Sequence, residues 1–241
     1  MIDTFDLTLK KRTKFAPDIY QLTFALPQSQ KLTFKAGQYM IFRIPQKAVG
    51  DVARRLYSIS TIAGTVDEFD IIMQYFKGGV ASEHFTRLIE GDSVAAQGPA
   101  GVFALQEGAR NRVFVATGTG ITPIMSMLRT DLSKSEDRKS TLLWGLRQAE
   151  DIYFLDELFE LKKNNPSFMF RVCLSQDTPS DDAEHMLSGR VQTGMESIFE
   201  PSELTRNDYY VCGSVKAVED IRAHLYLAGV PREQVHFERF V

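Results

Sequence analysis

Apolar and polar residues alternate along the first hundred positions of the chain. Phe5, Leu7 and Leu9 show the pattern, and Leu22 and Phe24 continue it. A period of two is typical of strands with one buried face. Such segments recur at 5–9, 20–26, 39–44, 56–61, 69–76 and 93–97, with one helix expected over 82–89. Six short strands predict an antiparallel barrel or sandwich.

The rhythm changes at residues 105–111. Beyond them, apolar strand patterns alternate with helical ones: strands at 112–116, 141–146, 168–174, 209–212 and 234–237, helices at 123–132, 151–163, 191–199 and up to 227. This order predicts a parallel sheet covered by helices on both faces. A length of 241 residues allows two domains. We therefore expect a β-barrel domain over 1–105 and an α/β domain over 106–241.

The composition is that of a globular protein, with 44% hydrophobic and 24% charged residues. The 28 Lys and Arg residues face 31 Asp and Glu residues, a net charge of -3. This balance gives no basic field and disfavours nucleic acid as a partner. There is no signal-peptide pattern and no apolar run of ~18 residues. We therefore expect no membrane span and a cytoplasmic location.

The cysteines and histidines predict no metal site. Cys173 and Cys212 lie far apart and cannot supply the four thiolates of an iron–sulfur cluster or a four-cysteine zinc site. The four histidines have no metal-ligand spacing. An iron–sulfur centre used by this protein would therefore belong to another chain.

A glycine turn is the clearest local motif. The buried strand Val113–Thr117 runs into Gly118-Thr-Gly120-Ile-Thr-Pro123, where a helix is expected to open at Pro123. Two glycines let the backbone approach a pyrophosphate, and the helix N-terminus offers N–H groups. Pro123 replaces the third glycine of the usual dinucleotide fingerprint. The motif favours nucleotide binding, and a structural turn is the alternative.

Two further motifs lie in the β half. The run Arg54-Arg-Leu-Tyr-Ser58 carries a cation, a ring and a hydroxyl on one strand. Phe76-Lys-Gly-Gly-Val-Ala-Ser82 is a glycine turn that leads into a helix and is able to bind an anion. By themselves, the first also fits an edge strand with an ion-paired arginine, and the second a plain connection.

Taken in order, the motifs resemble the ferredoxin–NADP reductase superfamily. The match rests on Arg55-Leu-Tyr57-Ser58, Gly78-Gly79 to Ser82, the glycine-rich Gly91 to Phe103, Gly118 to Pro123, Cys212-Gly213-Ser214 and Phe237-Glu238-Arg239-Phe240. It covers essentially the whole chain. The resemblance implies a six-stranded antiparallel flavin-binding barrel, a nicotinamide-nucleotide domain and a flavin ring in the cleft between them.

For the flavin, the resemblance implies roles for the first two motifs. Arg55 would neutralise the pyrophosphate, Tyr57 would stack on the isoalloxazine and Ser58 would hydrogen-bond near N5, with Leu56 between them. The backbone of the second turn would hold the other side of the pyrophosphate through Gly78, Gly79, Val80, Ala81 and Ser82. FAD is expected, and FMN is the alternative because no aromatic in the 46–53 loop would stack on an adenosine.

For the nucleotide, the resemblance implies a cradle and a catalytic group. The cradle comprises Thr117, Gly118, Thr119, Gly120, Thr122 and Pro123. Cys212, with Gly213, would lie beside the nicotinamide, Glu238 matches the family's acid, and Phe240 would cover the flavin face opposite Tyr57. Tyr57, Ser58, Cys212 and Glu238 are the expected catalytic residues.

Coenzyme preference should come from Leu174-Ser175-Gln176-Asp177. NADP-specific members of the family place an arginine after the serine, and here Gln176 follows. Asp177, with the nearby acids Asp181, Asp182 and Glu184, suits a ribose diol and repels a 2′-phosphate. We expect NADH, although Arg147 or Arg190 folding back would favour NADPH.

The expected function is a flavin-dependent NAD(P)H oxidoreductase. It would take a hydride from NAD(P)H and pass electrons to a separate acceptor such as a ferredoxin or an oxygenase component. The alternatives are an NAD(P)H:flavin reductase that uses free flavin, an electron-transfer subunit of a multicomponent oxygenase, and a non-catalytic nucleotide-binding module.

Overall fold

The computed structural model describes residues 2–46, 51–134, 137–178 and 184–240. The chain forms two compact units. The first comprises Met1–Leu105 with Met125–Met127, and the second comprises Gln106–Ile124 with Leu128–Val241.

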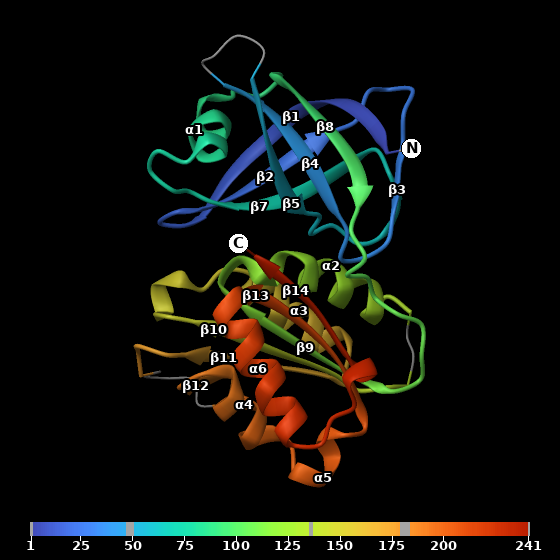
Figure 1. Ribbon diagram of the computed structural model, residues 1–241, viewed down its shortest axis with the longest axis vertical. Helices are drawn as coiled ribbons and strands as arrows, with labels where there is room; N and C mark the ends of the chain where they lie inside the picture. The colour runs from blue at the N-terminus through green and yellow to red at the C-terminus, as the bar shows by residue number, and fades with distance from the viewer. Residues whose placement is uncertain (1, 47–50, 135–136, 179–183, 241) are drawn as a thin grey trace. The chain divides into compact units, whose positions relative to one another are not determined.

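The first unit is built on a six-stranded antiparallel sheet in the order β5-β4-β8-β1-β2-β7 (Figure 1). Its strands are β1 (Asp3–Ala16), β2 (Ile19–Ala25), β4 (Tyr39–Pro45), β5 (Val52–Ser58), β7 (Glu68–Gln74) and β8 (Ser93–Ala100). A single antiparallel bridge joins Ile59, the residue after β5, to Ile71 of β7, so the two edges of the sheet meet there. The short strands β3 (Leu32–Phe34) and β6 (Gly64–Val66) pair separately.

The alternating apolar residues form the core of this unit. Leu22 and Phe24 of β2 are fully buried, and they pack with Phe42 of β4 and Phe85 of helix α1 (Val80–Arg87). The ring of Phe24 lies 5.1 Å from that of Phe42 and 6.0 Å from that of Phe85. Helix α1 is therefore anchored to the sheet by an aromatic side chain from its centre.

The second unit is a parallel six-stranded sheet in the order β12-β11-β10-β9-β13-β14. Its strands are β9 (Asn111–Thr117), β10 (Ser140–Leu146), β11 (Phe168–Leu174), β12 (Met186–Ser188), β13 (Asn207–Ser214) and β14 (Val235–Phe240). Its α-helices are α2 (Ile121–Leu132), α3 (Leu155–Asn164), α4 (Val191–Ile198), α5 (Pro201–Leu204) and α6 (Val215–Leu227). Short 3₁₀ turns lie at Gly118–Gly120, Ala149–Asp151 and Arg232–Gln234.

Helices cover both faces of the parallel sheet. α4 and α6 pack on the face that carries Val113, Val115 and Val211, and they lie in front of the sheet in Figure 1. α3 lies on the opposite face, where its Phe159 ring contacts Phe170 of β11 at 5.4 Å. Burial on both faces explains why the strands β9, β10 and β11 are apolar at most positions.

The main departures from the sequence expectations are at element ends. The strand carrying the Arg-Leu-Tyr-Ser motif covers Val52–Ser58 instead of 56–61. Helix α2 begins at Ile121, so Pro123 lies inside the first turn. Helix α3 begins at Leu155, after a 3₁₀ turn, instead of at residue 151. The short elements β3, β6, β12 and α5 were not expected, since a strand of three residues or a helix of four gives little periodicity.

None of the helices in the described ranges has the length and apolar content needed to cross a bilayer.

Candidate functional site: two glycine turns and a buried carboxyl

The end of strand β5 places a cation, a ring and a hydroxyl next to one another. Arg55 pairs with Phe42 across the sheet, Tyr57 with Met40 and Ser58 with Tyr39. Arg55 is exposed, Tyr57 is partly buried and Ser58 is buried. Leu56 points to solvent with 55% of its surface exposed.

Tyr57 is held edge-on by two phenylalanines. Its ring lies 5.8 Å from Phe42 at 83° and 5.4 Å from Phe85 at 74°. Burial raises the pKa of Tyr57 to about 12, and the charge of Arg55 opposes that shift. The phenol therefore stays neutral at physiological pH, and its ring orientation is fixed by packing.

The second glycine turn leads into helix α1, whose N-cap is Gly79. Gly78 has a φ of 76°, which favours glycine. The Ser82 hydroxyl accepts from the N–H of Phe76 at 2.9 Å, so this serine holds the turn together. Val80, Ala81 and Ser82 form the first turn of the helix, where backbone N–H groups have no helical partner.

Glu83 adds a negative charge to this turn, a feature not expected from the sequence. One carboxylate oxygen, Oε1, accepts from the N–H of Gly78 at 3.3 Å and from the hydroxyl of Tyr75 at 3.0 Å. These two hydrogen bonds lower the pKa of Glu83. The only sequence signal for Glu83 is that an acid is favoured in the first turn of a helix.

Arg12 closes the other end of helix α1. Its Nη1 donates to the carbonyls of Phe85, Thr86 and Leu88 at 3.1, 2.8 and 3.1 Å. A guanidinium at a helix C-terminus satisfies the last carbonyls and complements the helix dipole. Arg12 therefore fixes the helix whose first turn carries Gly78 to Ser82.

In the second unit, the Gly118 turn rests on strand β13. Gly118 has a φ of 53°, and the turn passes so close to β13 that a Cβ at Gly120 would collide with the carbonyl of Cys212. The hydroxyl of Thr122 donates to the carbonyl of Thr119 at 2.8 Å. Gly213 packs equally closely on Thr117. Only glycine fits at positions 120 and 213. This close packing explains the glycines of the Gly118 to Pro123 motif and of the Cys212-Gly213-Ser214 motif.

One row of residues crosses four strands beneath this turn. In the strand register, Trp144 of β10 pairs with Ala116 of β9, Ala116 with Cys212 of β13, and Cys212 with Glu238 of β14. The row joins two predicted catalytic residues, Cys212 and Glu238, and a tryptophan that the motifs did not single out. The periodicity of the sequence does not reveal this row, because the row depends on the register between strands.

Burial raises the pKa of both the Cys212 thiol and the Glu238 carboxyl. Burial raises the pKa of Glu238 to about 7, and its Oε2 has no hydrogen-bond partner among the described residues. Burial, and then the charge of Glu238, raises the pKa of the Cys212 thiol well above its usual value. A carboxyl with a pKa near neutrality is able to hold or release a proton at physiological pH.

The predicted coenzyme-reading residues come together at the ends of β10 and β11. The Ser175 and Gln176 N–H groups donate to the carbonyls of Leu146 and Arg147. Asp177 accepts from the N–H of Ala149 at 3.1 Å through Oδ2 and from that of Thr178 at 2.9 Å through Oδ1. Its negative charge is therefore fixed in place at this edge.

The remaining predicted residues are placed as follows. Arg147 is exposed. Arg190 faces Asp220 of α6, with 3.6 Å between Nη1 and Oδ2. Phe240 ends β14 beside Ser214 of β13, and Val241 lies outside the described residues, as do Asp181 and Asp182.

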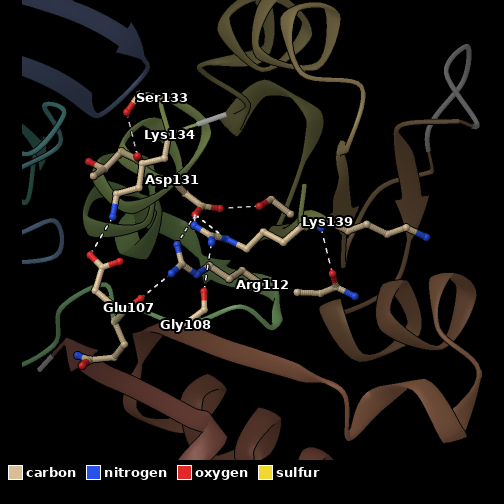
Figure 2. A network of polar contacts seen from close by, with 12 residues as sticks. Glu107, Gly108, Arg112, Asp131, Ser133, Lys134 and Lys139 are labelled. Carbon is tan, nitrogen blue, oxygen red and sulfur yellow. Dashed lines mark hydrogen bonds and ion pairs between the residues drawn. The ribbon is translucent and has the colours of Figure 1, made fainter. Parts of the chain in front are cut away.

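A buried ion cluster fixes the chain segment that leads into β9. Asp131 of α2 accepts from Arg112 and Arg138, and from the hydroxyl of Ser140 at 2.5 Å. Arg138 also donates to the carbonyl of Gly108 at 3.1 Å, and Lys134 pairs with Glu107 at 2.9 Å (Figure 2). This cluster lies at the amino ends of β9 and β10, opposite the edge that carries the glycine turn.

The two glycine turns fit phosphate-bearing ligands. Beside both Gly78 and Gly118, no heavy atom lies within 4 Å of the position that a Cβ would take. Both turns open a helix of at least eight residues, where N–H groups and the helix dipole favour an anion. The residues present therefore fit a flavin dinucleotide in the first unit and a nicotinamide dinucleotide in the second.

Comparison with known proteins agrees with this geometry. The oxidoreductase FAD-binding domain family matches residues 6–105, and the oxidoreductase NAD-binding domain family matches residues 114–231. The chain is 31% identical to ferredoxin–NADP reductase B of Sorangium cellulosum, over 99% of this chain and 98% of that protein. The chain belongs to the ferredoxin–NADP reductase family. It is an FAD- and NAD(P)H-dependent oxidoreductase, which confirms the predicted family, cofactors and enzyme class.

The chain spans only part of the length of some other relatives. The reductase component of propane 2-monooxygenase from Mycolicibacterium goodii is 31% identical over 92% of this chain, which spans 64% of that protein. A cytochrome P450 reductase from Amycolatopsis superposes with a TM-score of 0.87 at 26% identity, covering 99% of this chain and 70% of that one. These matches confirm the predicted fold class of an antiparallel flavin domain followed by a parallel nucleotide domain.

Among the described residues of the reductase, no group of three or more His, Cys, Asp or Glu side chains is arranged to hold a metal ion.

Proposed function

We propose that this reductase oxidises NADH and delivers the electrons to a separate protein, either a ferredoxin or an oxygenase component. The observation that carries the proposal is the Cys212 and Glu238 pair beneath the Gly118 turn. The pair places a neutral thiol and a carboxyl of pKa about 7 at the edge where the nicotinamide nucleotide would bind.

Each motif then has a defined task. Bound flavin supplies the ability to accept a hydride and to release electrons singly or in pairs. Arg55 and the N–H groups of Val80 to Ser82 would bind pyrophosphate oxygens. Tyr57 would present a neutral ring, and the Ser58 hydroxyl would hydrogen-bond at the reacting nitrogen.

In the nucleotide unit, Thr117 to Pro123 would bind the nicotinamide nucleotide's pyrophosphate. Cys212 would contact the nicotinamide as a protonated, polarizable thiol. Glu238 would keep or release a proton beside it.

NADH is the proposed coenzyme because of Asp177. Its carboxylate is fixed by two backbone N–H groups at the end of β11. A fixed negative charge repels a 2′-phosphate and accepts hydrogen bonds from a ribose diol. We also propose a cytoplasmic location, where NADH is supplied and where the buried free cysteines Cys173 and Cys212 stay reduced.

The acceptor proposal follows from the relatives. One is a ferredoxin–NADP reductase, and another is the reductase component of a monooxygenase. The cysteine content of this chain does not supply an iron–sulfur cluster, so a one-electron carrier would be a separate chain or a further domain.

The test is anaerobic rapid mixing of the flavin-loaded protein with NADH and with NADPH. We expect the bound flavin to be reduced faster by NADH. Reoxidation is then followed with a [2Fe–2S] ferredoxin, with free FMN and with a quinone. Preference for the ferredoxin supports the proposal, preference for free FMN supports a flavin reductase, and no reduction by either nucleotide overturns both.

A further inference from the structure

We infer that Trp144 is a positioning residue for the nicotinamide nucleotide, because it orients the first peptide of the pyrophosphate-binding turn. This inference rests on the proposed function of the Gly118 turn. Trp144 lies on β10, not on the turn, and the reductase has no other tryptophan.

The contact is a hydrogen bond from a buried side chain. The indole Nε1 of Trp144 donates to the carbonyl oxygen of Gly118 at 3.0 Å. The Trp144 side chain is fully buried, and the ring of Tyr153 packs against it at 4.9 Å and 84°. The indole therefore has little freedom to turn away from the carbonyl.

The orientation of that carbonyl determines where the next N–H group points. In a trans peptide, the C=O and the following N–H point in opposite directions. Since the Gly118 carbonyl is directed at the Trp144 ring, the Thr119 N–H is directed away from it. Gly118 is exposed, and the position of its missing Cβ has no neighbour within 4 Å.

Gly118 needs such a restraint more than other residues of the turn. Glycine adopts positive and negative φ with similar ease, and here φ is 53°. The turn is fixed on its other side where Gly120 meets the Cys212 carbonyl. The Gly118 carbonyl also accepts from the N–H of Ile121. Without the indole N–H, this second hydrogen bond alone would hold the peptide between Gly118 and Thr119, and part of the anion-binding geometry would have to be ordered by the ligand.

The first test is Trp144→Phe, which keeps an aromatic ring but removes the N–H. In rapid mixing with NADH, we expect the apparent Kd to rise about five- to tenfold, the value of one net hydrogen bond. The limiting rate of flavin reduction and the flavin content should change less than twofold. Phe170→Leu is the matched control, because Phe170 is a fully buried aromatic on the adjacent strand β11, where its ring packs with Phe159, Phe168 and His185.

A second test uses the wild-type protein and does not depend on a variant's folding. Binding of NAD⁺, which cannot reduce the flavin, should change the emission of Trp144 with the same Kd found by equilibrium dialysis. The inference is overturned if Trp144→Phe binds NADH like wild type, or if NAD⁺ binds without changing the emission. If neither nucleotide binds the wild-type protein, the proposed function itself fails, and that result is distinguishable from the other two.

Discussion

Cys212 and Glu238 lie opposite each other on the adjacent parallel strands β13 and β14. Glu238 is partly buried, and its Oε2 is shielded from water and has no hydrogen-bond partner among the described residues. A buried carboxyl oxygen without a hydrogen-bond partner costs stability, so the presence of Glu238 beside Cys212 is better explained by chemistry than by folding.

The first prediction concerns the pH dependence of stability. Below about pH 4.5, Glu238 is protonated in both the folded and the unfolded chain. Between about pH 4.5 and 7, it ionises only when unfolded, so the unfolding free energy falls by roughly 3 kcal/mol over this window and is constant above it. Glu238→Gln should remove this fall. Denaturant unfolding at pH 5 and pH 8 measures it, and the exposed Glu233→Gln is the control.

The second prediction concerns the pH dependence of the reaction. The limiting rate of flavin reduction by NADH should change near pH 7 in the wild type and lose that inflection in Glu238→Gln. Anaerobic stopped-flow between pH 5.5 and 9 would measure both profiles (a range chosen to bracket that pKa). An unchanged inflection in the variant would assign the titrating group elsewhere.

The third prediction concerns coenzyme choice. Asp177→Ser removes the negative charge at the end of β11 but keeps a small hydrogen-bonding side chain. We expect kcat/KM for NADPH to rise about tenfold, because the variant no longer repels a 2′-phosphate, and that for NADH to fall. Asp156→Ser, a charge on helix α3, provides the comparison. A wild-type preference for NADPH would contradict the assignment of Asp177.

The fourth prediction concerns flavin affinity. Glu83 holds the Gly78 N–H and places a negative charge in the turn proposed to bind the flavin pyrophosphate. Glu83→Gln keeps an acceptor and removes the charge, so FAD should bind about fivefold more tightly. Titration of the flavin-free protein with FAD would measure this. The exposed Glu90→Gln should have no effect, and weaker binding in Glu83→Gln would show that the carboxylate supports the turn more than it repels the ligand.

The fifth prediction concerns the ion cluster around Asp131. Asp131→Asn would leave Arg112 and Arg138 facing each other with no carboxylate between them. Removing one partner from a buried ion pair costs about 3–5 kcal/mol, so the second unit should unfold at markedly lower denaturant. Asp67→Asn, which breaks the exposed pair with Lys31, should leave the unfolding midpoint unchanged.

Several strands and helices predicted from the sequence can be compared with the structure residue by residue. The alternation of Phe5, Leu7 and Leu9 predicted a half-buried strand, and all three are buried in β1. The turn from Val113 to Pro123 predicted a strand and a helix, which the structure shows as β9 and α2. The close approach of Gly120 to the carbonyl of Cys212 was not predicted. The predicted start of α3 at residue 151 was wrong, since the helix begins at Leu155. Acidic residues are favoured in the first turn of a helix, and the acids at 151, 156 and 157 fit a start at either residue.

The sequence by itself determined the two-part architecture, the strands and the glycine turns, because each depends on neighbours within a few residues along the chain. The tertiary structure alone decided which side chains restrain those turns. Trp144 donates a hydrogen bond to Gly118, 26 residues away, and Arg12 donates to Leu88 at the end of helix α1, 76 residues away. Glu238 lies beside Cys212 through the register of β13 and β14. The raised pKa of Glu238 likewise arises from burial, and burial depends on how strands from distant parts of the chain pack together.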